Sequence, residues 1–471
     1  MSELLERVII PLRLALICRA GQTLGYNPVL NVWHRLDERC AEALRWLRAG
    51  RDRAALVHYF AKRFNCSVEQ ASKEIHEIIK WCILRRMLYL DRQLTTAKPL
   101  LGTNVLRSVY WICTQACNLK CMYCYQDAAM ARSNELSTAE AKDLIEQARE
   151  LGVESFIFTG GEPFVRRDLL DIATLAKTKG MRTSVISNGH YISRKNIHRV
   201  ALVFDSVTIS LDHMIPAHHD RVRGSGSWQR AIDAIDLLLD AGVQVNVNST
   251  LSSAGLRDIQ QLISLKYKKR LSAHRIVPQF PMGRAASARQ DELTPAELVD
   301  LSDELYRANQ EAAQSNAFLS TTQNRKGQRR VHCGAGLSEI AVDSQGWVYP
   351  CKLLQYPQHR AGNIRELRLH DIVTKDTALR EARRAVVDTL HPCKTCIIKN
   401  HCGGGCRGIH FSFTREYAQS SPLFCAHLRR TFEVQAWAST GDVPPPRTTQ
   451  FNDTTVSDSQ LIPISSLTAN Q

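Results

Sequence analysis

The sequence predicts an α/β protein in three parts, built around a parallel sheet. Between about residues 105 and 285, apolar stretches of strand length alternate with amphipathic helical stretches. A winged-helix-like order of strands and helices precedes this region, and a cysteine-rich segment follows it. At 471 residues the chain is long enough for about three domains. It contains no run close to the roughly 18–20 apolar residues that a membrane-spanning helix needs.

The first part, residues 1–95, lacks the regular alternation of the second. The apolar pattern predicts a strand-like opening at 7–17, a short strand at 29–36, helices at 37–47, 53–64 and 67–81, and a closing segment at 84–90. Strands followed by three helices in this order are typical of a winged helix. We therefore expect a small recognition domain at the front of the chain.

The net charge of +15 raises the question of a nucleic-acid partner. Residues 1–95 contain sixteen basic and ten acidic residues. The basic residues are scattered, however, and the third helical stretch also carries Glu69, Glu74 and Glu77. An acidic peptide partner or a solvated basic surface explains this charge as well as DNA does, and we expect no nucleic-acid partner.

The second part, residues 105–285, has six predicted strands joined by helices. The strands are expected at 109–112, 155–159, 182–187, 206–211, 243–250 and 273–277, and the main helices at 138–150, 168–177, 228–240 and 256–265. Ser137 is a candidate N-cap of the first of these helices. Because such βα units form a parallel sheet, functional residues are expected at the carboxyl ends of the strands.

Three cysteines follow the first of these strands at the spacing C-x3-C-x2-C, namely Cys117, Cys121 and Cys124. Three thiolates on one loop can hold three irons of a [4Fe–4S] cluster and leave the fourth iron open to a small molecule. A zinc site would need a fourth Cys or His nearby. The only local candidate, Cys113, belongs to the predicted strand.

The three-cysteine motif resembles the signature of radical S-adenosylmethionine (SAM) enzymes. The resemblance implies a partial (β/α)6 TIM-like barrel, a SAM molecule chelated by the open iron, and hydrogen abstraction by a 5′-deoxyadenosyl radical. The segment after the second strand resembles the family's GGEP motif. By this resemblance eight residues at strand ends would contact SAM, namely Gly160, Gly161, Glu162, Pro163, Ser187, Asn188, Ser210 and Asp212.

The third part, residues 333–436, contains seven more cysteines: Cys333, Cys351, Cys393, Cys396, Cys402, Cys406 and Cys425. This pattern resembles the SPASM extension, which implies two auxiliary [4Fe–4S] clusters with interleaved ligands. Cys393, Cys396, Cys402 and Cys425 would hold one cluster. Cys333, Cys351 and Cys406 would hold the other, which is one thiolate short. Either a ligand other than cysteine completes it or an iron is open.

A disulfide scaffold is the alternative explanation of these cysteines. We consider it the weaker one, because the chain has no convincing signal peptide and a reduced cluster is suited to a cytoplasmic location. Four further cysteines, at positions 18, 40, 66 and 82, have no cluster spacing and are expected to be single thiols.

The remaining segments carry fewer signals. Residues 286–332 are predicted to form a helical and then basic linker, and residues 437–471 a disordered tail rich in Ser, Thr and Pro. A hairpin is expected at 343–351. The turn Gly283-Arg284-Ala285 resembles one found in SPASM relatives, and Arg284 is expected to be a surface residue.

The order of domains resembles a peptide maturase whose front domain is of the PQQ-biosynthesis recognition type. This implies that the leader of a ribosomally made precursor peptide adds as a strand beside the 29–36 strand and the third helix. The implied reaction is an oxidative crosslink (thioether or carbon–carbon) or a related modification, with a flavodoxin or ferredoxin as reductant. Two alternatives stay open: a maturase of sulfatases or an enzyme of haem-type cofactor synthesis, and an iron–sulfur DNA-binding regulator. No residue stands out as the general base.

Overall fold

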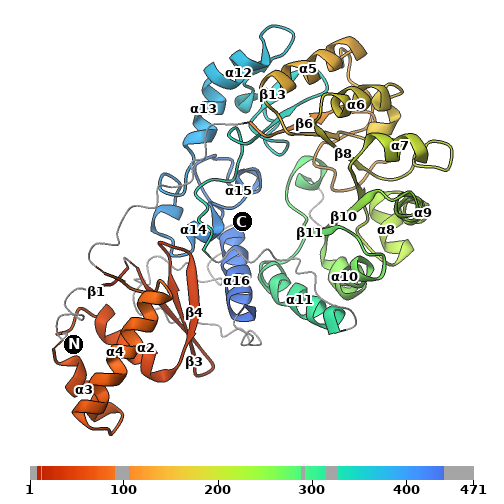
Figure 1. The fold of residues 1–471 in the computed structure, drawn as a ribbon. Coiled ribbons are helices and arrows are strands. Elements are labelled where there is room, and N and C mark those ends of the chain that lie inside the picture. Colours follow the sequence, from red (N-terminus) through yellow and green to blue (C-terminus); the bar gives the residue numbers. More distant parts are fainter. Residues whose placement is uncertain are drawn as a thin grey trace.

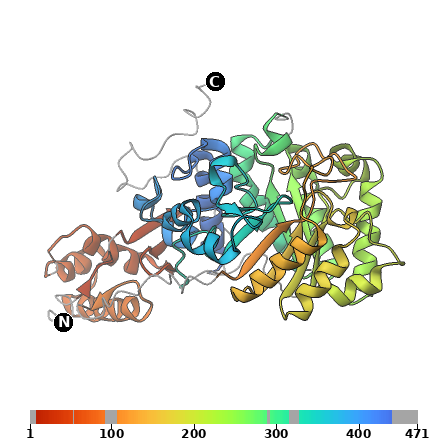
Figure 2. The same ribbon diagram turned by 90° about the horizontal axis from the view of Figure 1, so that it is seen from above.

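The structure, a computed structural model, describes residues 8–11, 13–52, 54–90, 106–287, 292–314 and 327–439. The cysteine-rich domain lies between the N-terminal domain and the α/β domain in both views (Figures 1 and 2). Within these described ranges, no helix has the length and apolar character that crossing a membrane would demand.

The N-terminal domain is an antiparallel three-stranded sheet followed by three helices. Its elements are β2 (Ala15–Arg19), β3 (Gln22–Asn27), β4 (Val32–Leu36), α2 (Glu38–Arg48), α3 (Leu56–Arg63) and α4 (Val68–Leu84), and β1 (Val8–Ile9) pairs with β5 (Tyr89–Leu90). The three helices follow the strands as predicted, but β3 was not predicted and the strand-like opening expected at 7–17 divides into β1 and β2. The strand expected at 29–36 starts only at Val32, because the Asn27 side chain accepts a hydrogen bond from Val29 N and holds a turn there.

Two of the four cysteines expected to be isolated are in fact neighbours. The Sγ atoms of Cys40 and Cys82 lie 3.7 Å apart, and both side chains are buried in the core between α2 and α4. Both behave as small core hydrophobes, as free cysteines commonly do.

The α/β domain is built on an open nine-stranded sheet in the order β11-β10-β9-β8-β7-β6-β12-β13-β14. The six predicted strands are all present and parallel: β6 (Ser108–Ile112), β7 (Ser155–Thr159), β8 (Arg182–Ser187), β9 (Ser206–Ser210), β10 (Gln244–Leu251) and β11 (Ala273–Pro278). The sheet curves but does not close into a barrel (Figure 1).

Helices cover one face of this sheet. They are α5 (Thr138–Glu150), α6 (Leu169–Thr178), α7 (Ile197–Val203), α8 (Pro216–Arg223), α9 (Ser227–Asp240) and α10 (Ile259–Lys268). Ser137 caps α5 as expected, in a capping box with Glu140. Alternate strand residues such as Trp111 and Phe158 pack under the helices. Side chains alternate along a strand, so the intervening residues of each strand point to the opposite, concave face. Thr208 on β9 and Asn246 on β10 are two of them.

The cysteine-rich domain extends this sheet. Strand β12 (Glu339–Val342) pairs in parallel with β6, and β13 (Trp347–Tyr349) and β14 (Gly362–Asn363) follow in antiparallel order. The hairpin expected at 343–351 is therefore present. Its turn is held by the Asp343 carboxylate, which accepts hydrogen bonds from Gln345 N and Trp347 N, each at 2.9 Å.

Two predicted segments gain detail from the structure. The helical part predicted within 286–332 is α11 (Pro295–Gln314), which packs between α10 and α16 (Pro422–Ala438). Asp303 on α11 forms an ion pair with Arg430 on α16. The tail cannot begin at residue 437, because Trp437 is fully buried within α16. The rest of the predicted basic run, 315–326, and the tail from 440 onward lie outside the described residues.

Four shorter helices complete the cysteine-rich domain: α12 (Leu369–Lys375), α13 (Thr377–Arg384), α14 (Lys399–Cys402) and α15 (Arg407–Thr414).

The N-terminal sheet packs directly on this domain. The ring centroids of Tyr26 on β3 and Phe432 on α16 are 4.8 Å apart, and those of Trp33 on β4 and Phe432 are 5.6 Å apart. Arg19 on β2 forms a buried ion pair with Glu433 at 3.3 Å. One face of the N-terminal sheet thus shares a core with α14 and α16.

Candidate functional site

The loop between β6 and α5 carries Cys117, Cys121 and Cys124 at the carboxyl end of the parallel strands. The three thiols are partly exposed and lie close enough to influence one another. Burial raises the pKa of the Cys117 thiol to about 11, and the neighbouring cysteines add to the shift. A thiol with a raised pKa is a poor free thiolate, so the thiolate form of Cys117 is favoured only when a bound metal stabilises it.

A single zinc ion does not fit this loop. Cys113, the one local candidate for a fourth ligand, is fully buried in the core under the sheet. Among the described residues, the group whose metal-ligating atoms all lie within 4.8 Å of one another contains no cysteine. The thiols are therefore spaced more widely than four ligands around one zinc, as a cluster with several irons requires.

The Gly160-Gly161 turn holds the start of the cysteine loop. A Cβ atom on Gly161 would lie 2.2 Å from Ala116 O, and one on Gly160 would lie 2.5 Å from Thr114 O. Gly161 N donates to Thr114 O at 2.8 Å, and Glu162 N donates to Ala116 O at 2.9 Å. The close approach that the glycines permit is thus to the cysteine loop, an arrangement that the sequence alone did not indicate.

Glu162 is fully buried beside this turn, at the start of the short 3-10 helix that begins with Pro163. Its carboxylate accepts hydrogen bonds from Ser187 Oγ and Asn188 N, both at 2.8 Å. Asn188 in turn donates to Asn118 of the cysteine loop at 2.9 Å. Burial raises the pKa of Glu162 to about 7, although these hydrogen bonds oppose the shift.

Asp212, which follows β9, is bound by protein groups on both oxygens. It forms an ion pair with Arg223 of α8, and accepts hydrogen bonds from the Tyr123 hydroxyl and from Thr250 N. These contacts hold Tyr123 of the cysteine loop. Asp212 therefore positions Tyr123 and Arg223, and its contact with SAM stays a prediction. Ser210 lies at the end of the same strand and is partly exposed.

Arg284 is not a surface residue. Its guanidinium donates from Nε to Cys121 O at 2.8 Å and from a terminal nitrogen to Ala128 O at 2.9 Å. Its backbone N donates to Cys124 O at 3.1 Å. Gly283 makes this approach possible, because a Cβ there would lie 2.2 Å from Cys124 O. The turn therefore fastens the far end of the cysteine loop.

The seven C-terminal cysteines form two separate groups. Cys393, Cys396, Cys402 and Cys425 line one cavity, with His410 and Arg429 at its edge. Cys333, Cys351 and Cys406 lie near one another around Glu339 and Tyr417. The structure thus brings together the same two sets that the resemblance implied. The set of three has Glu339 and Tyr417 as its non-cysteine oxygen neighbours.

The sequence analysis missed a charged group on the concave face of the sheet. Arg275 on β11, Glu339 on β12 and Lys352 interact electrostatically there, and Lys352 Nζ lies 4.6 Å from the ring centroid of Tyr110 on β6. Burial raises the pKa of Glu339 and lowers that of Lys352. The only signal in the sequence that could have indicated this group was the alternation of polar and apolar residues along the strands that carry Arg275 and Glu339.

Comparison with known proteins agrees with this geometry. The family model of the Radical SAM superfamily matches residues 111–259, and that of the SPASM iron–sulfur cluster-binding domain matches residues 333–397. The chain is 27% identical over 352 residues to AdoMet-dependent heme synthase of Nitratidesulfovibrio vulgaris, covering 70% of this chain and 94% of that protein. It is 29% identical over 335 residues to the mycofactocin maturase MftC of Mycobacterium ulcerans, covering 68% and 89%.

Two solved structures have a similar fold. The structure of anSMEcpe with bound AdoMet has a TM-score of 0.61 at 19% identity, and the match covers 71% of this chain and 98% of that one. Streptococcus suis SuiB bound to precursor peptide SuiA has a TM-score of 0.53 at 15% identity, covering 88% and 97%. The predicted cofactors, [4Fe–4S] clusters and SAM, are confirmed by the two family matches.

Replacing Arg284 by Gln should loosen the cysteine loop. The change removes a charged donor from two partly buried hydrogen bonds, which we expect to cost about 2 kcal/mol locally. Iron content of the anaerobically reconstituted protein should fall by up to one cluster equivalent. The control is Arg194→Gln at an exposed position. Unchanged iron content in the Arg284→Gln protein would contradict the assignment.

Replacing Glu162 by Gln should change how stability depends on pH. The carboxyl titrates near 4.5 when unfolded and near 7 when folded, so the folded protein binds the extra proton between these values. Stability of the cluster-free protein should therefore fall as pH rises through this window, by up to about 3 kcal/mol. Urea unfolding at both ends of the window measures this fall. The Glu162→Gln protein should lack this fall in stability, and the control Glu154→Gln, at an exposed position, should keep it. An equal fall with pH in both variants and in the unaltered protein would refute the explanation.

Proposed function

We propose that this chain, a radical SAM enzyme with a C-terminal SPASM domain, modifies a ribosomally made precursor peptide. Cys117, Cys121 and Cys124 would hold the SAM-binding cluster, and the two C-terminal sets the auxiliary clusters. When bound, SAM and its cluster supply the 5′-deoxyadenosyl radical that removes a hydrogen atom from substrate. The protein's own residues bind the peptide, orient it and hold the cysteine loop.

The observation that carries this proposal is the position of β4 at the edge of its sheet. Among the described strands, β4 lies last in the order β2-β3-β4 and pairs with β3, which is the kind of position where a peptide adds as a strand. Helix α4 lies beside it, where the rings of His34 and Trp81 have centroids 5.4 Å apart. Leu84 on α4 is 82% exposed. An extended leader peptide would gain main-chain hydrogen bonds from β4 and apolar contacts from α4.

The position of this edge suits substrate delivery. The sheet that contains β4 packs on α14 and α16 of the cysteine-rich domain. A leader held at β4 would therefore keep the following core peptide near that domain. The match to SuiB, whose structure was determined with its precursor peptide SuiA, covers more of this chain than the match to anSMEcpe, by about the length of the N-terminal domain.

The concave face of the sheet would receive the residue to be modified. Arg275, Glu339 and Lys352 lie there between the loop of Cys124 and the set that contains Cys351. They offer charged groups to orient a peptide and to move a proton. A substrate radical that forms a new thioether or carbon–carbon bond must lose one electron, and the nearby auxiliary cluster site would hold its acceptor.

A role in haem synthesis is the second candidate. It is favoured by the 27% identity to AdoMet-dependent heme synthase across 94% of that protein. The N-terminal edge strand and the exposed apolar surface of α4 would have no evident use in that reaction. We therefore prefer a peptide substrate.

Leader binding tests the proposal. A fluorescent synthetic leader from the precursor encoded beside this protein should bind the full chain in an anisotropy titration. Trp81→Ala should weaken binding by roughly 2 kcal/mol, about thirtyfold, while His58→Ala on exposed α3 should not. With the full precursor, SAM and reductant, mass spectrometry should show the loss of two hydrogen atoms. Binding no tighter than that of a scrambled peptide, or turnover of a porphyrin instead, would contradict it.

A further inference from the structure

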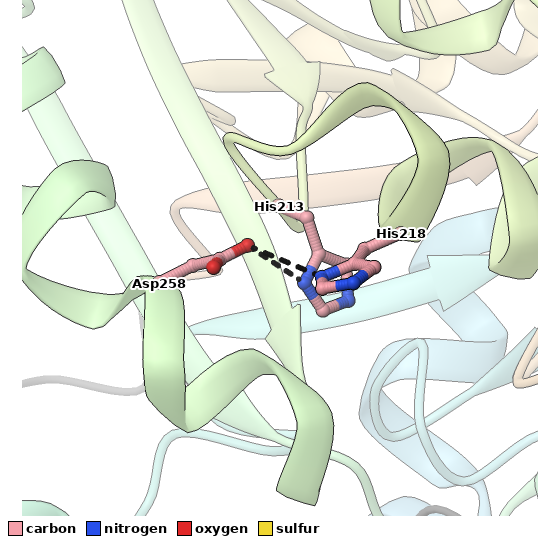
Figure 3. Close-up of side chains that lie close together, drawn as sticks. All are labelled: His213, His218 and Asp258. Atoms are coloured by element: carbon pink, nitrogen blue, oxygen red, sulfur yellow. Dashed lines mark hydrogen bonds and ion pairs between the residues drawn. The ribbon is translucent and has the colours of Figure 1, made fainter.

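Two histidines and an aspartate gather beside the cysteine loop but outside the site described above. His213 directly follows Asp212, His218 lies on α8, and Asp258 ends the short 3-10 helix at Ser253–Asp258. Asp258 Oδ2 lies 3.2 Å from His213 Nδ1 and 3.9 Å from His218 Nδ1. Figure 3 shows both imidazole rings turned toward the same carboxylate. One ligating atom from each residue lies within 4.8 Å of the other two.

Several polar atoms of this group are buried without a hydrogen bond. His213 and Asp258 are each only 1% exposed. In the described structure, His213 Nε2, His218 Nδ1 and Asp258 Oδ1 have no hydrogen-bond partner. Leaving such atoms unpaired costs free energy, and each case needs an explanation. A hydrogen bond between His213 and Asp258 alone does not explain these atoms, because it leaves His218 Nδ1 without a hydrogen bond next to the Asp258 carboxylate.

The spacing and the ligand types suit one transition-metal ion. Nitrogen and oxygen ligands at about 2.0–2.1 Å from a tetrahedral zinc lie roughly 3.4 Å apart, and the two observed distances bracket this value. Two imidazoles and one carboxylate are typical zinc or iron(II) ligands, whereas Mg²⁺ and Ca²⁺ prefer oxygen ligands.

The surrounding chain is built closely around the group. A Cβ atom on Gly255 would lie 3.1 Å from His213 Cε1, so the glycine lets the 3-10 helix close over this imidazole. His218 also lines a surface pocket with Arg257 and Glu297. An ion held by the three residues would keep one coordination position open toward this pocket.

We propose that His213, His218 and Asp258 bind a single divalent transition-metal ion, best matched by Zn²⁺. The ion would join the segment after β9 to the 3-10 helix that precedes α10. Because Asp212 adjoins His213 and holds Tyr123 and Arg223, the ion would support the cysteine loop from outside. This site is separate from the cluster sites and does not depend on the identity of the substrate.

The test is metal analysis of the anaerobically reconstituted holoenzyme after incubation with Zn²⁺ and removal of free metal. Elemental analysis should find about one zinc per chain in addition to the cluster iron. X-ray absorption at the zinc edge should show nitrogen and oxygen ligands near 2.0–2.1 Å without sulfur near 2.3 Å. Sulfur ligands would place the zinc in a cysteine site and overturn the proposal, as would absence of bound zinc.

Variants locate the ion. His213→Ala and His218→Gln should each weaken zinc binding by roughly 10–100-fold or more while cluster absorbance is retained. His218 is 38% exposed, so its replacement should leave the fold intact even if His213→Ala does not. The control His198→Ala, at an exposed position on α7, should bind zinc as the unaltered protein does. Zinc retained in the His218→Gln protein would refute the site.

Discussion

The loop that carries Cys117, Cys121 and Cys124 is the part of the structure on which the rest depends. Three thiols can share one cluster only if the loop backbone is fixed, and the loop's own backbone hydrogen bonds, such as that from Cys117 N to Ala129 O, satisfy only some of its peptide groups. Other parts of the fold supply the remaining hydrogen bonds. Gly161 and Glu162 form hydrogen bonds with the first residues of the loop, and Arg284 forms them with its last residues. Asp212 accepts a hydrogen bond from Tyr123 of the loop. These partners come from the ends of three different strands, so the parallel sheet is what brings them together.

The need to hold cluster-binding cysteines in place also explains how the cysteine-rich domain and the N-terminal domain are arranged. Strand β12 joins the sheet beside β6, which fixes the set of Cys333, Cys351 and Cys406 relative to the concave face. On the opposite side, Tyr26 of the N-terminal sheet packs near Cys396 and Cys402. Burial raises the pKa of the Tyr26 hydroxyl, and the two nearby cysteines add to the shift. The N-terminal domain therefore forms part of the wall behind the four-cysteine set.

Much of the fold could be predicted from local patterns. Strand positions and the Ser137 cap follow from periodicity and capping residues, and the resemblance to the SPASM extension implied the 343–351 hairpin and the two auxiliary cluster sets. Features that depend on contacts far apart in sequence could not be predicted. Arg284 was expected at the surface because its partners, Cys121 and Ala128, lie about 160 residues away. The packing of α11 against α16 and the burial of Trp437 are of the same kind, since amphipathicity does not say which surface a helix meets.

Formation of 5′-deoxyadenosine tests the central claim most directly. The protein is reconstituted anaerobically with iron and sulfide, and dithionite and SAM are added before mass spectrometry. The account predicts that the unaltered protein produces 5′-deoxyadenosine and that a variant with Cys117, Cys121 and Cys124 all replaced by Ala does not. Equal production by both proteins, or a preparation that binds zinc in these cysteines in place of iron, would contradict it.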